Sequence, residues 1–113
     1  MAEPCVFCRI ARGEIPAKMV VNNKEIVAFR DLNPQAPTHI LVIPKKHVAS
    51  LDDATEPDLL GRMLVLIAAI ARQEGIAKTG YRVVTNTGAH GGQSVAHLHL
   101  HLLGGREMSW PPG

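Results

Sequence analysis

Three histidines, His97, His99 and His101, alternate with apolar residues in the run that ends at Leu103. Strict alternation has the period of a β-strand, in which successive side chains point to opposite faces. The sequence therefore predicts a strand over residues 95–103, with the imidazoles on one face and the intervening leucines on the other. From a rise of about 3.3 Å per residue, neighbouring imidazoles lie about 6.6 Å apart and the outer two about 13 Å apart. Because zinc–imidazole bonds are about 2.0–2.1 Å long, one metal ion cannot bind all three.

The chain is expected to form one domain, residues 1–113, because it is long enough for one hydrophobic core and too short for two. Its 46% apolar and 19% charged residues are typical of a globular protein. A net charge of +2 gives no reason to expect a nucleic-acid partner. The longest apolar run, residues 63–71, is too short to cross a bilayer, and residues 1–4 do not begin a secretory signal. No membrane partner is therefore expected, and the expected location is the cytoplasm.

The remaining patterns predict an α+β fold, with a mostly antiparallel sheet of about five strands and two helices. A short helix is expected over residues 5–12. Thr55 is expected to cap a long helix that has Pro57 in its first turn and ends at Gly75. Besides 95–103, the expected strands are residues 19–21, 26–29, 39–43 and 81–85, and the expected loops are residues 31–37 and 86–93.

The histidine strand has three interpretations. The imidazoles can line a solvated sheet face, or an HxH pair can bind a metal with a third ligand from elsewhere. In the third interpretation one imidazole is a nucleophile and its neighbours move protons, because a neutral imidazole is a competent nucleophile near pH 7. The preceding Gly-Gly-Gln-Ser, residues 91–94, favours this third interpretation, since glycines let a backbone approach a ligand and turn N–H groups can bind an anion.

Cys5 and Cys8 form a CxxC pair with three alternatives. A redox pair usually opens a helix after a strand in a βαβ unit, and the expected elements contain no such unit. Half of a zinc site requires two more ligands that converge on the pair. The third alternative is a pair of buried thiols.

The chain resembles the histidine triad (HIT) family of nucleotide-binding hydrolases and transferases. The family signature His-φ-His-φ-His-φ-φ, with φ apolar, is matched at every position by residues 97–103. Further matching segments are residues 7–10, 13–18, 31–39 and 43–47, and the ending, residues 103–113, resembles the Hint branch rather than the dinucleotide-cleaving Fhit branch. The resemblance implies a HIT-like fold, a homodimer whose sheets join edge to edge, and cleavage of the P–N bond of purine nucleoside 5′-phosphoramidates. Such substrates join AMP or GMP to an amine, for example that of lysine.

The resemblance assigns each histidine a role. His99 would attack the α-phosphorus and form a nucleotidyl-imidazole intermediate that water then cleaves, which replaces one hard displacement by two easier ones. His101 would bind the phosphate and protonate the departing amine, which is a very poor leaving group as an anion. His97 would orient the array, with His39 as a partner. From its local sequence alone, His39 also fits a purely structural histidine.

The resemblance also implies a nucleotide site, in which Asp31 would accept hydrogen bonds from both ribose hydroxyls and Leu32 would pack on the base. The other expected nucleotide-binding residues are Asn86, Gly92, Gln93, Ser94, His99 and His101. Simpler roles exist for some of them. Asp31 can cap the bend before Pro34, Asn86 can be a turn residue, and Ser94 can satisfy loop backbone. His90 departs from the acidic or small residue expected in this branch.

Some bacterial members of the family close a zinc site with two histidines, which correspond to His47 and His97 here. Together with Cys5 and Cys8 they would form a closed, structural Cys₂His₂ site, while catalysis itself would need no cofactor. The tail, residues 104–113, is expected to place Trp110 near the active site of the partner subunit. The alternative is a tail that packs on its own surface.

Three other functions remain as alternatives. One is an enzyme of the same fold that hydrolyses dinucleoside polyphosphates or transfers nucleotidyl groups. Another is a regulatory module that binds purine nucleotides without turnover. The third is a metallohydrolase that uses the HxH pair, whose activity chelation would abolish.

Overall fold

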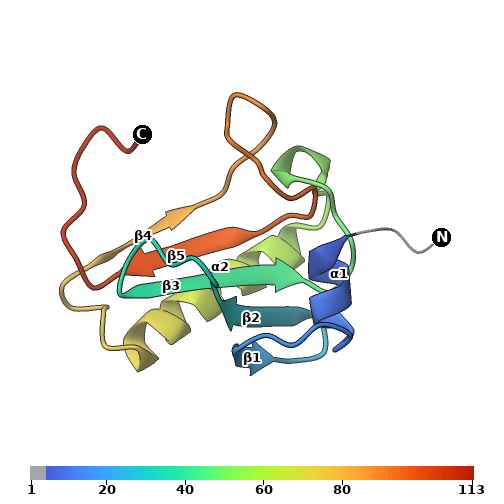
Figure 1. The fold of residues 1–113 in the computed structure, drawn as a ribbon, viewed down its shortest axis with the longest axis horizontal. Coiled ribbons are helices and arrows are strands. Elements are labelled where there is room, and N and C mark those ends of the chain that lie inside the picture. The colour runs from blue at the N-terminus through green and yellow to red at the C-terminus, as the bar shows by residue number, and fades with distance from the viewer. Residues whose placement is uncertain (1–4) are drawn as a thin grey trace.

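The computed structural model describes residues 5–113, and it shows an antiparallel sheet in the order β1-β2-β3-β5-β4 with a helix on each face (Figure 1). The strands are β1 (Met19–Asn22), β2 (Ile26–Arg30), β3 (Thr38–Pro44), β4 (Tyr81–Val84) and β5 (Leu100–Gly104). The helices are α1 (Val6–Ala11), α2 (Pro57–Gln73) and a short 3-10 helix, η1 (Leu51–Asp53). The predicted α+β class with a five-stranded antiparallel sheet and two α-helices is confirmed, whereas η1 is not predicted by the sequence.

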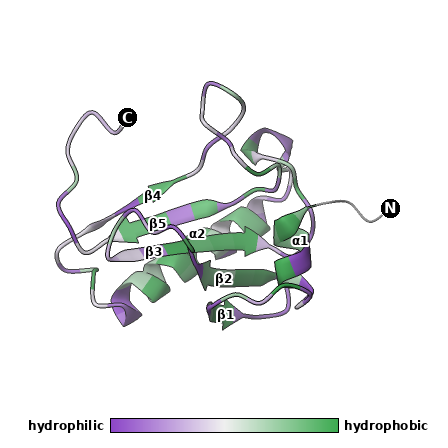
Figure 2. Cartoon of the chain, viewed as in Figure 1, coloured by the Kyte–Doolittle hydropathy of each residue, from purple (hydrophilic) through white to green (hydrophobic). Residues whose placement is uncertain are grey.

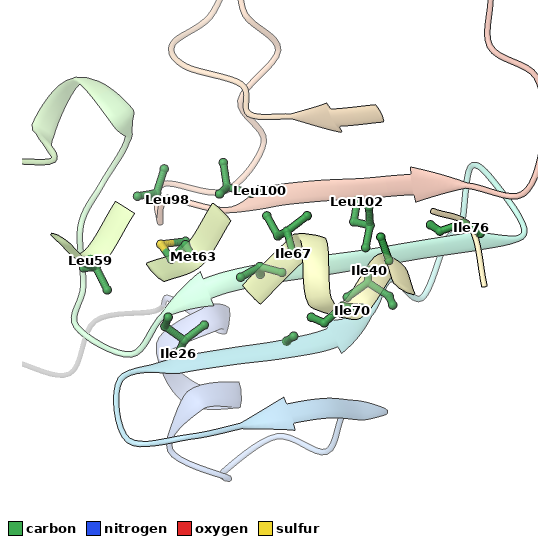
Figure 3. Packing of buried hydrophobic residues seen from close by; sticks show 13 residues of the cluster. Ile26, Ile40, Leu59, Met63, Ile67, Ile70, Ile76, Leu98, Leu100 and Leu102 are labelled. Atoms are coloured by element: carbon green, nitrogen blue, oxygen red, sulfur yellow. The ribbon is translucent and has the colours of Figure 1, made fainter. Parts of the chain in front are cut away.

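The long helix α2 covers the sheet face to which the leucines of the histidine segment point (Figure 3). Leu98, Leu100 and Leu102 are buried there with Met63 and Ile67 of α2. Figure 2 shows the same separation, with hydrophobic colouring along β3 and α2 and hydrophilic colouring concentrated in the connections. Each fully buried leucine contributes about 1.5–3 kcal/mol of hydrophobic stabilisation, which fixes the face on which the alternating histidines must lie.

The short helix α1 covers only one end of the opposite face (Figure 1). Phe7 and Ile10 of α1 pack on Val27, Phe29 and Leu41 of the sheet in a second buried cluster. The histidines point to this same face, so the sequence alternation separates the packing face from the histidine face as predicted.

The predicted strand 95–103 is wrong at its start, because β5 begins only at Leu100. β5 pairs with β3 in a register that matches Val42 with Leu100, which would bring Leu98 opposite Pro44. Proline has no N–H to donate to a ladder. Instead, the N–H of Leu98 donates to the carbonyl of Val48, which follows β3. His97 and His99 therefore lie in an unpaired segment, and only His101 lies within the strand.

The predicted cap at Thr55 is also wrong. Glu56 is the N-cap of α2, and within the described chain no side chain hydrogen-bonds at that cap. Pro57 is the first helical residue, and it holds the preceding Glu56 in extended backbone (φ −111°, ψ 95°). At the other end Gly75 follows the helix with φ +78°, a conformation that favours glycine. None of the helices in residues 5–113 is long and apolar enough to cross a membrane.

Candidate active site

Four histidines converge on the sheet face that α1 leaves partly uncovered. His101 belongs to β5 and His39 to the neighbouring β3, and their ring centroids are 5.2 Å apart. The ring of His99 lies 5.0 Å from that of His101. Phe7 of α1 contacts His99 edge-on at a centroid distance of 5.1 Å, and also His97 at 6.0 Å. Phe7 falls within the short helix expected over residues 5–12, but the sequence contained no signal that this ring would pack on the histidines.

The hydrogen bonds of His99 define which nitrogen carries its proton. Nδ1 lies 2.7 Å from the carbonyl oxygen of His97, which can only accept a hydrogen bond. Nδ1 is therefore protonated, and Nε2 keeps its lone pair. The carbonyl of His99 in turn accepts a hydrogen bond from the hydroxyl of Thr85 at 3.0 Å. His99 is 4% exposed and lines a cavity, an arrangement that would suit an imidazole nucleophile in a largely desolvated place.

The same reasoning fixes the protons of His39 and His101. The backbone N–H of Gln35 donates to Nδ1 of His39 at 3.0 Å, so the proton of His39 is on Nε2. That Nε2 lies 2.9 Å from Nδ1 of His101, which must therefore accept. The proton of neutral His101 is consequently on Nε2. Burial, and then the neighbouring imidazoles of His99 and His39, lower the pKa of His101 to about 4.

Asp31 adds a carboxylate beside this chain of histidines. One oxygen, Oδ1, accepts the backbone N–H of Asn33 at 2.8 Å, which is the bend-capping role expected from the local sequence. The other oxygen, Oδ2, lies 3.4 Å from Nε2 of His39. Asp31, His39 and His101 are close enough for a metal ion. The Gln35 N–H occupies Nδ1 of His39, however, so His39 would need lone pairs on both nitrogens to bind one, and the neutral ring has only one.

A cavity of about 290 Å³ opens in front of His99 and His101. Its remaining wall is formed by α1, by the segment that follows α1, by β2 and β3, and by the residues just before the triad: Val6, Phe7, Ile10, Ile15, Pro16, Ala17, Phe29, Arg30, Asp31, Leu32, Leu41, Ser94 and Val95. Most of this wall is apolar, with the carboxylate of Asp31 and the hydroxyl of Ser94 among the few polar groups. Leu32 is 90% exposed at the rim. Such a cavity suits a flat apolar ring at one end and polar chemistry at the histidine end.

The glycine-rich loop before the triad is held together by its own amides. Gln93 donates to the carbonyls of Ala49 and Val95, and its Oε1 accepts the N–H of Gly88. Asn86 donates to the carbonyl of Gly91 at 2.7 Å. Glycine is required at position 91, because a Cβ there would lie 2.3 Å from the carbonyl oxygen of Thr87. Asn86, Gly92 and Gln93 thus shape the loop, whereas Ser94, which follows it, reaches the cavity wall.

A second cluster joins the start of α1 to the segment that follows β3, which contains His47, and to the segment that precedes β5, which contains His97. Sγ of Cys5 lies 3.3 Å from Nδ1 of His97, and Sγ of Cys8 lies 3.2 Å from Nδ1 of His47 and 3.5 Å from that of His97. Nε2 of His97 donates to the carbonyl of Pro44 at 2.8 Å, so the lone pair of this ring is on Nδ1 and faces the sulfurs. All four ligand atoms lie within 4.8 Å of one another.

This donor set fits zinc. Tetrahedral zinc with bonds of about 2.3 Å to sulfur and 2.0–2.1 Å to nitrogen places its ligand atoms about 3.4–3.8 Å apart. The three sulfur–nitrogen distances in the cluster, 3.2, 3.3 and 3.5 Å, are close to this range. Four protein ligands would leave no position for substrate, which is the pattern of a structural site.

Trp110, which is expected near the active site of a partner subunit, does not line the cavity of its own chain. Trp110 is 80% exposed on the tail, so it does not pack on the surface of its own chain. The guanidinium of Arg82 donates to the carbonyl of the preceding Ser109 at 2.9 Å, and Arg106 donates to the carbonyl of Gln35 at 3.0 Å. The exposed His90 lies in the glycine-rich loop.

The fold and the site together define a class: a protein built on an antiparallel sheet, with four histidines gathered beside a largely apolar cavity. Comparison with known proteins agrees. The profile of the HIT domain matches residues 12–108. The chain therefore belongs to the HIT domain family, and the expectation that it is an enzyme of this family, a hydrolase, is confirmed.

Similar proteins span nearly the whole chain. A HIT-like protein of Synechococcus elongatus is 55% identical over 115 residues, which cover 100% of both chains. The purine nucleoside phosphoramidase of Escherichia coli K12 is 51% identical over 110 residues, 96% of this chain and 92% of that protein. The crystal structure of a HIT family hydrolase from Legionella pneumophila superposes with a TM-score of 0.94 at 54% identity, covering 96% of this chain and 99% of that one.

Proposed function

We propose that this enzyme hydrolyses the P–N bond of purine nucleoside 5′-phosphoramidates through a nucleotidyl intermediate on His99. The observation that carries the proposal is the pair of assigned protons, which gives His99 a lone pair on Nε2 and His101 a proton on Nε2, in rings whose centroids are 5.0 Å apart. The similarity to the purine nucleoside phosphoramidase of E. coli supports the choice of substrate.

In the first step Nε2 of His99 attacks the α-phosphorus, and the P–N bond breaks with its electron pair passing to the departing nitrogen. The anionic phosphate favours the imidazolium form of His101, which takes up a proton at Nδ1 and donates its Nε2 proton to the leaving amine. This donation is needed because an amide anion is a very poor leaving group. His101 returns to a neutral ring, now with its lone pair on Nε2.

In the second step water attacks the phosphorus and the bond to His99 breaks. Nε2 of His101 accepts the proton of that water, and His99 recovers its lone pair. The nucleoside monophosphate leaves, and His101 releases its extra proton to solvent. Both steps use the same two nitrogens, so the chemistry needs no metal ion at the phosphate.

We assign the cavity in front of His99 to the nucleotide. Asp31 would accept the ribose hydroxyls, and the apolar wall with Leu32 at its rim would hold the purine of an AMP or GMP derivative. Ser94 supports this assignment because it lines the cavity near the histidines. Asn86, Gly92 and Gln93 would contribute by holding the loop that presents Ser94.

We also infer a structural zinc ion bound by Cys5, Cys8, His47 and His97. Its chemistry would be to crosslink α1 to the sheet and to hold the ring of His97. The backbone carbonyl of His97 accepts the Nδ1 proton of His99, so a fixed His97 helps to keep the nucleophile in its reactive form. Thiolate ligands also suit the reducing cytoplasm in which we place the enzyme.

A homodimer in which two copies of the sheet join at β4 completes the proposal. β4 is an edge strand, and Tyr81 and Val83 on it are 39% and 36% exposed. Leu64 of α2 is 53% exposed. A partner subunit would cover this edge, which otherwise presents unpaired backbone groups, and would receive the tail with Trp110.

The direct test is release of AMP from an adenosine 5′-phosphoramidate by the wild type and by His99→Ala, each with and without a chelator. His90→Ala, which alters an exposed loop histidine, is the matched control. Turnover that resists chelation, disappears in His99→Ala and survives in His90→Ala is expected.

Other outcomes would favour the alternatives. Faster cleavage of a dinucleoside polyphosphate would indicate P–O–P chemistry, and immediate loss of activity with chelator would indicate a metallohydrolase. Tight AMP binding without turnover would indicate a regulatory module.

A further inference from the structure

Asp31 is placed to do more than bind a ribose. Its two carboxylate oxygens face different groups: Oδ1 accepts the N–H of Asn33 at 2.8 Å, and Oδ2 lies 3.4 Å from Nε2 of His39. Only Oδ1 is needed to cap the bend. The orientation of Oδ2 towards a histidine that is itself 6% exposed is therefore not explained by the local turn.

The protons of the two neighbouring histidines make this orientation significant. His39 carries one proton, on Nε2, because the N–H of Gln35 occupies Nδ1. That proton lies in the 2.9 Å gap between His39 and Nδ1 of His101. When His101 becomes an imidazolium, its second proton is on Nδ1, in the same gap. Two protons cannot lie between nitrogens 2.9 Å apart, so one of them needs another acceptor.

Oδ2 of Asp31 is the oxygen placed to be that acceptor. We propose that Asp31, besides its expected contact with the ribose, is a positioning residue for the acid: Oδ2 receives the Nε2 proton of His39 while His101 carries the proton that it passes to the departing amine. The inference rests on the proposed function, since it concerns the protonated form of His101 in that reaction.

Electrostatics point in the same direction. The groups that face His101 are His99 from the segment before β5, His39 from β3 and Asp31 from the loop that precedes β3. The two imidazoles disfavour a positive charge on His101, and Asp31 is the group of this set that favours it. A carboxylate near a cationic histidine stabilises the charged form.

The test separates this role from ribose binding by using 2′,3′-dideoxyadenosine substrates, which have no ribose hydroxyls for Asp31 to bind. One substrate is the 5′-phosphoramidate of an alkylamine, and this amine must be protonated to leave. The other is the 5′-phosphate ester of p-nitrophenol, and its p-nitrophenolate leaves as an anion. Single-turnover rates of leaving-group release are compared for the wild type and Asp31→Asn, which retains an oxygen for the Asn33 N–H. Asp52→Asn, in the exposed helix η1, is the control.

With the alkylamine, Asp31→Asn should be slower than the wild type by about tenfold or more, since acid catalysis contributes about 10²–10⁴-fold in total. With p-nitrophenolate the two rates should agree within about twofold. Equal losses on both substrates, or no loss on either, would overturn the inference while leaving the phosphoramidase function intact. Absence of wild-type turnover on an adenosine phosphoramidate would instead contradict the proposed function.

A second measurement needs no turnover. ¹⁵N spectra of the imidazoles, recorded with bound 2′,3′-dideoxyadenosine 5′-phosphate, give the pH at which His101 protonates. His101 should protonate at a higher pH in the wild type than in Asp31→Asn. Identical titrations of His101 in the two proteins, or failure of the nucleotide to bind, would overturn the inference.

Discussion

At the scale of single residues, the three histidines of the motif differ in which ring nitrogen accepts a hydrogen bond or keeps a lone pair. His97 presents a lone pair on Nδ1 to two sulfurs, His99 keeps one on Nε2, and His101 accepts from His39. The partners that fix these states are backbone groups, the carbonyls of Pro44 and His97 and the N–H of Gln35. Backbone hydrogen bonds thus give three residues of the same type different arrangements of ring protons and lone pairs.

The lowered pKa of His101 predicts how stability depends on pH. In the unfolded chain this histidine protonates near pH 6.5, whereas in the folded protein burial and two imidazoles lower its pKa to about 4. Between these values the unfolded state holds the extra proton, so stability falls as the pH falls, by up to about 1.4 kcal/mol per pH unit for one proton.

His101→Gln removes this group, so urea unfolding should show a smaller loss of stability between pH 6.5 and 4 than in the wild type. His90→Gln, in the exposed loop, should keep the wild-type slope. Parallel curves for His101→Gln and the wild type would show that His101 titrates normally in the folded protein.

At the scale of elements, a bidentate ion pair joins β2 to the end of α2. Both terminal nitrogens of Arg30 donate to the carboxylate of Glu74, at 3.0 and 2.9 Å. The side chain of Glu74 is 18% exposed, and this hydrogen bond raises the pKa of Arg30. The pair is more shielded than that of Arg12 with Glu14, whose side chains are both 48% exposed.

We expect Glu74→Gln to lower the free energy of unfolding by about 1–2 kcal/mol, because it weakens charge-assisted hydrogen bonds in a partly buried pair. Glu14→Gln, which alters the exposed pair, should lower the free energy of unfolding much less, because solvent screens that pair. Chemical denaturation of both variants at low and high salt makes the comparison. Equal losses of unfolding free energy for the two substitutions would show that the lower solvent exposure of the Arg30–Glu74 pair does not strengthen it.

Elements were predictable from the sequence where side-chain periodicity decides them. The alternation of histidine and leucine gave the correct faces, and the pattern of apolar residues located α2. The start of β5 was not predictable, because it depends on Pro44 lying opposite Leu98 in the register of another strand. The cap at Thr55 failed because the restriction that Pro57 places on Glu56 outweighs the capping preference of threonine.

The sequence predicted which residues belong to the candidate site, but not all of the contacts among them. Spacing alone identified the histidines, and the resemblance supplied His39, His47 and Asp31, which lie far away in the sequence. The contacts of Phe7 with two triad histidines and the role of the Gln35 N–H had no sequence signal, because each depends on how a loop or a short helix docks on the sheet.

At the scale of the whole molecule, the Cys–His cluster fastens α1 to the sheet. Removal of the zinc that we propose should loosen this attachment and lower the melting temperature by about 5 °C or more. Cys8→Ser should do the same, and elemental analysis should find one zinc per chain in the wild type and less in the variant. Metal-free protein with an unchanged melting temperature would contradict the structural role.

The proposed dimer gives a second whole-molecule prediction. Val83→Lys places a charge on the exposed edge strand β4, and it should convert the dimer to a monomer in sedimentation at micromolar concentration. Met19→Lys, on the opposite edge strand β1 and 40% exposed, is the matched control and should remain dimeric. A wild type that sediments as a monomer, or dissociation of both variants, would contradict an interface at β4.

The central claim is that His99 becomes covalently attached to the nucleotide, and trapping that intermediate tests it most directly. Enzyme in excess over an adenosine 5′-phosphoramidate is quenched in alkali at short times, and its intact mass and peptide map are measured. We predict an AMP adduct on His99 that forms and decays as fast as turnover and is absent from His99→Ala. Turnover without an adduct, together with activity in His99→Ala, would show that water attacks the phosphorus directly.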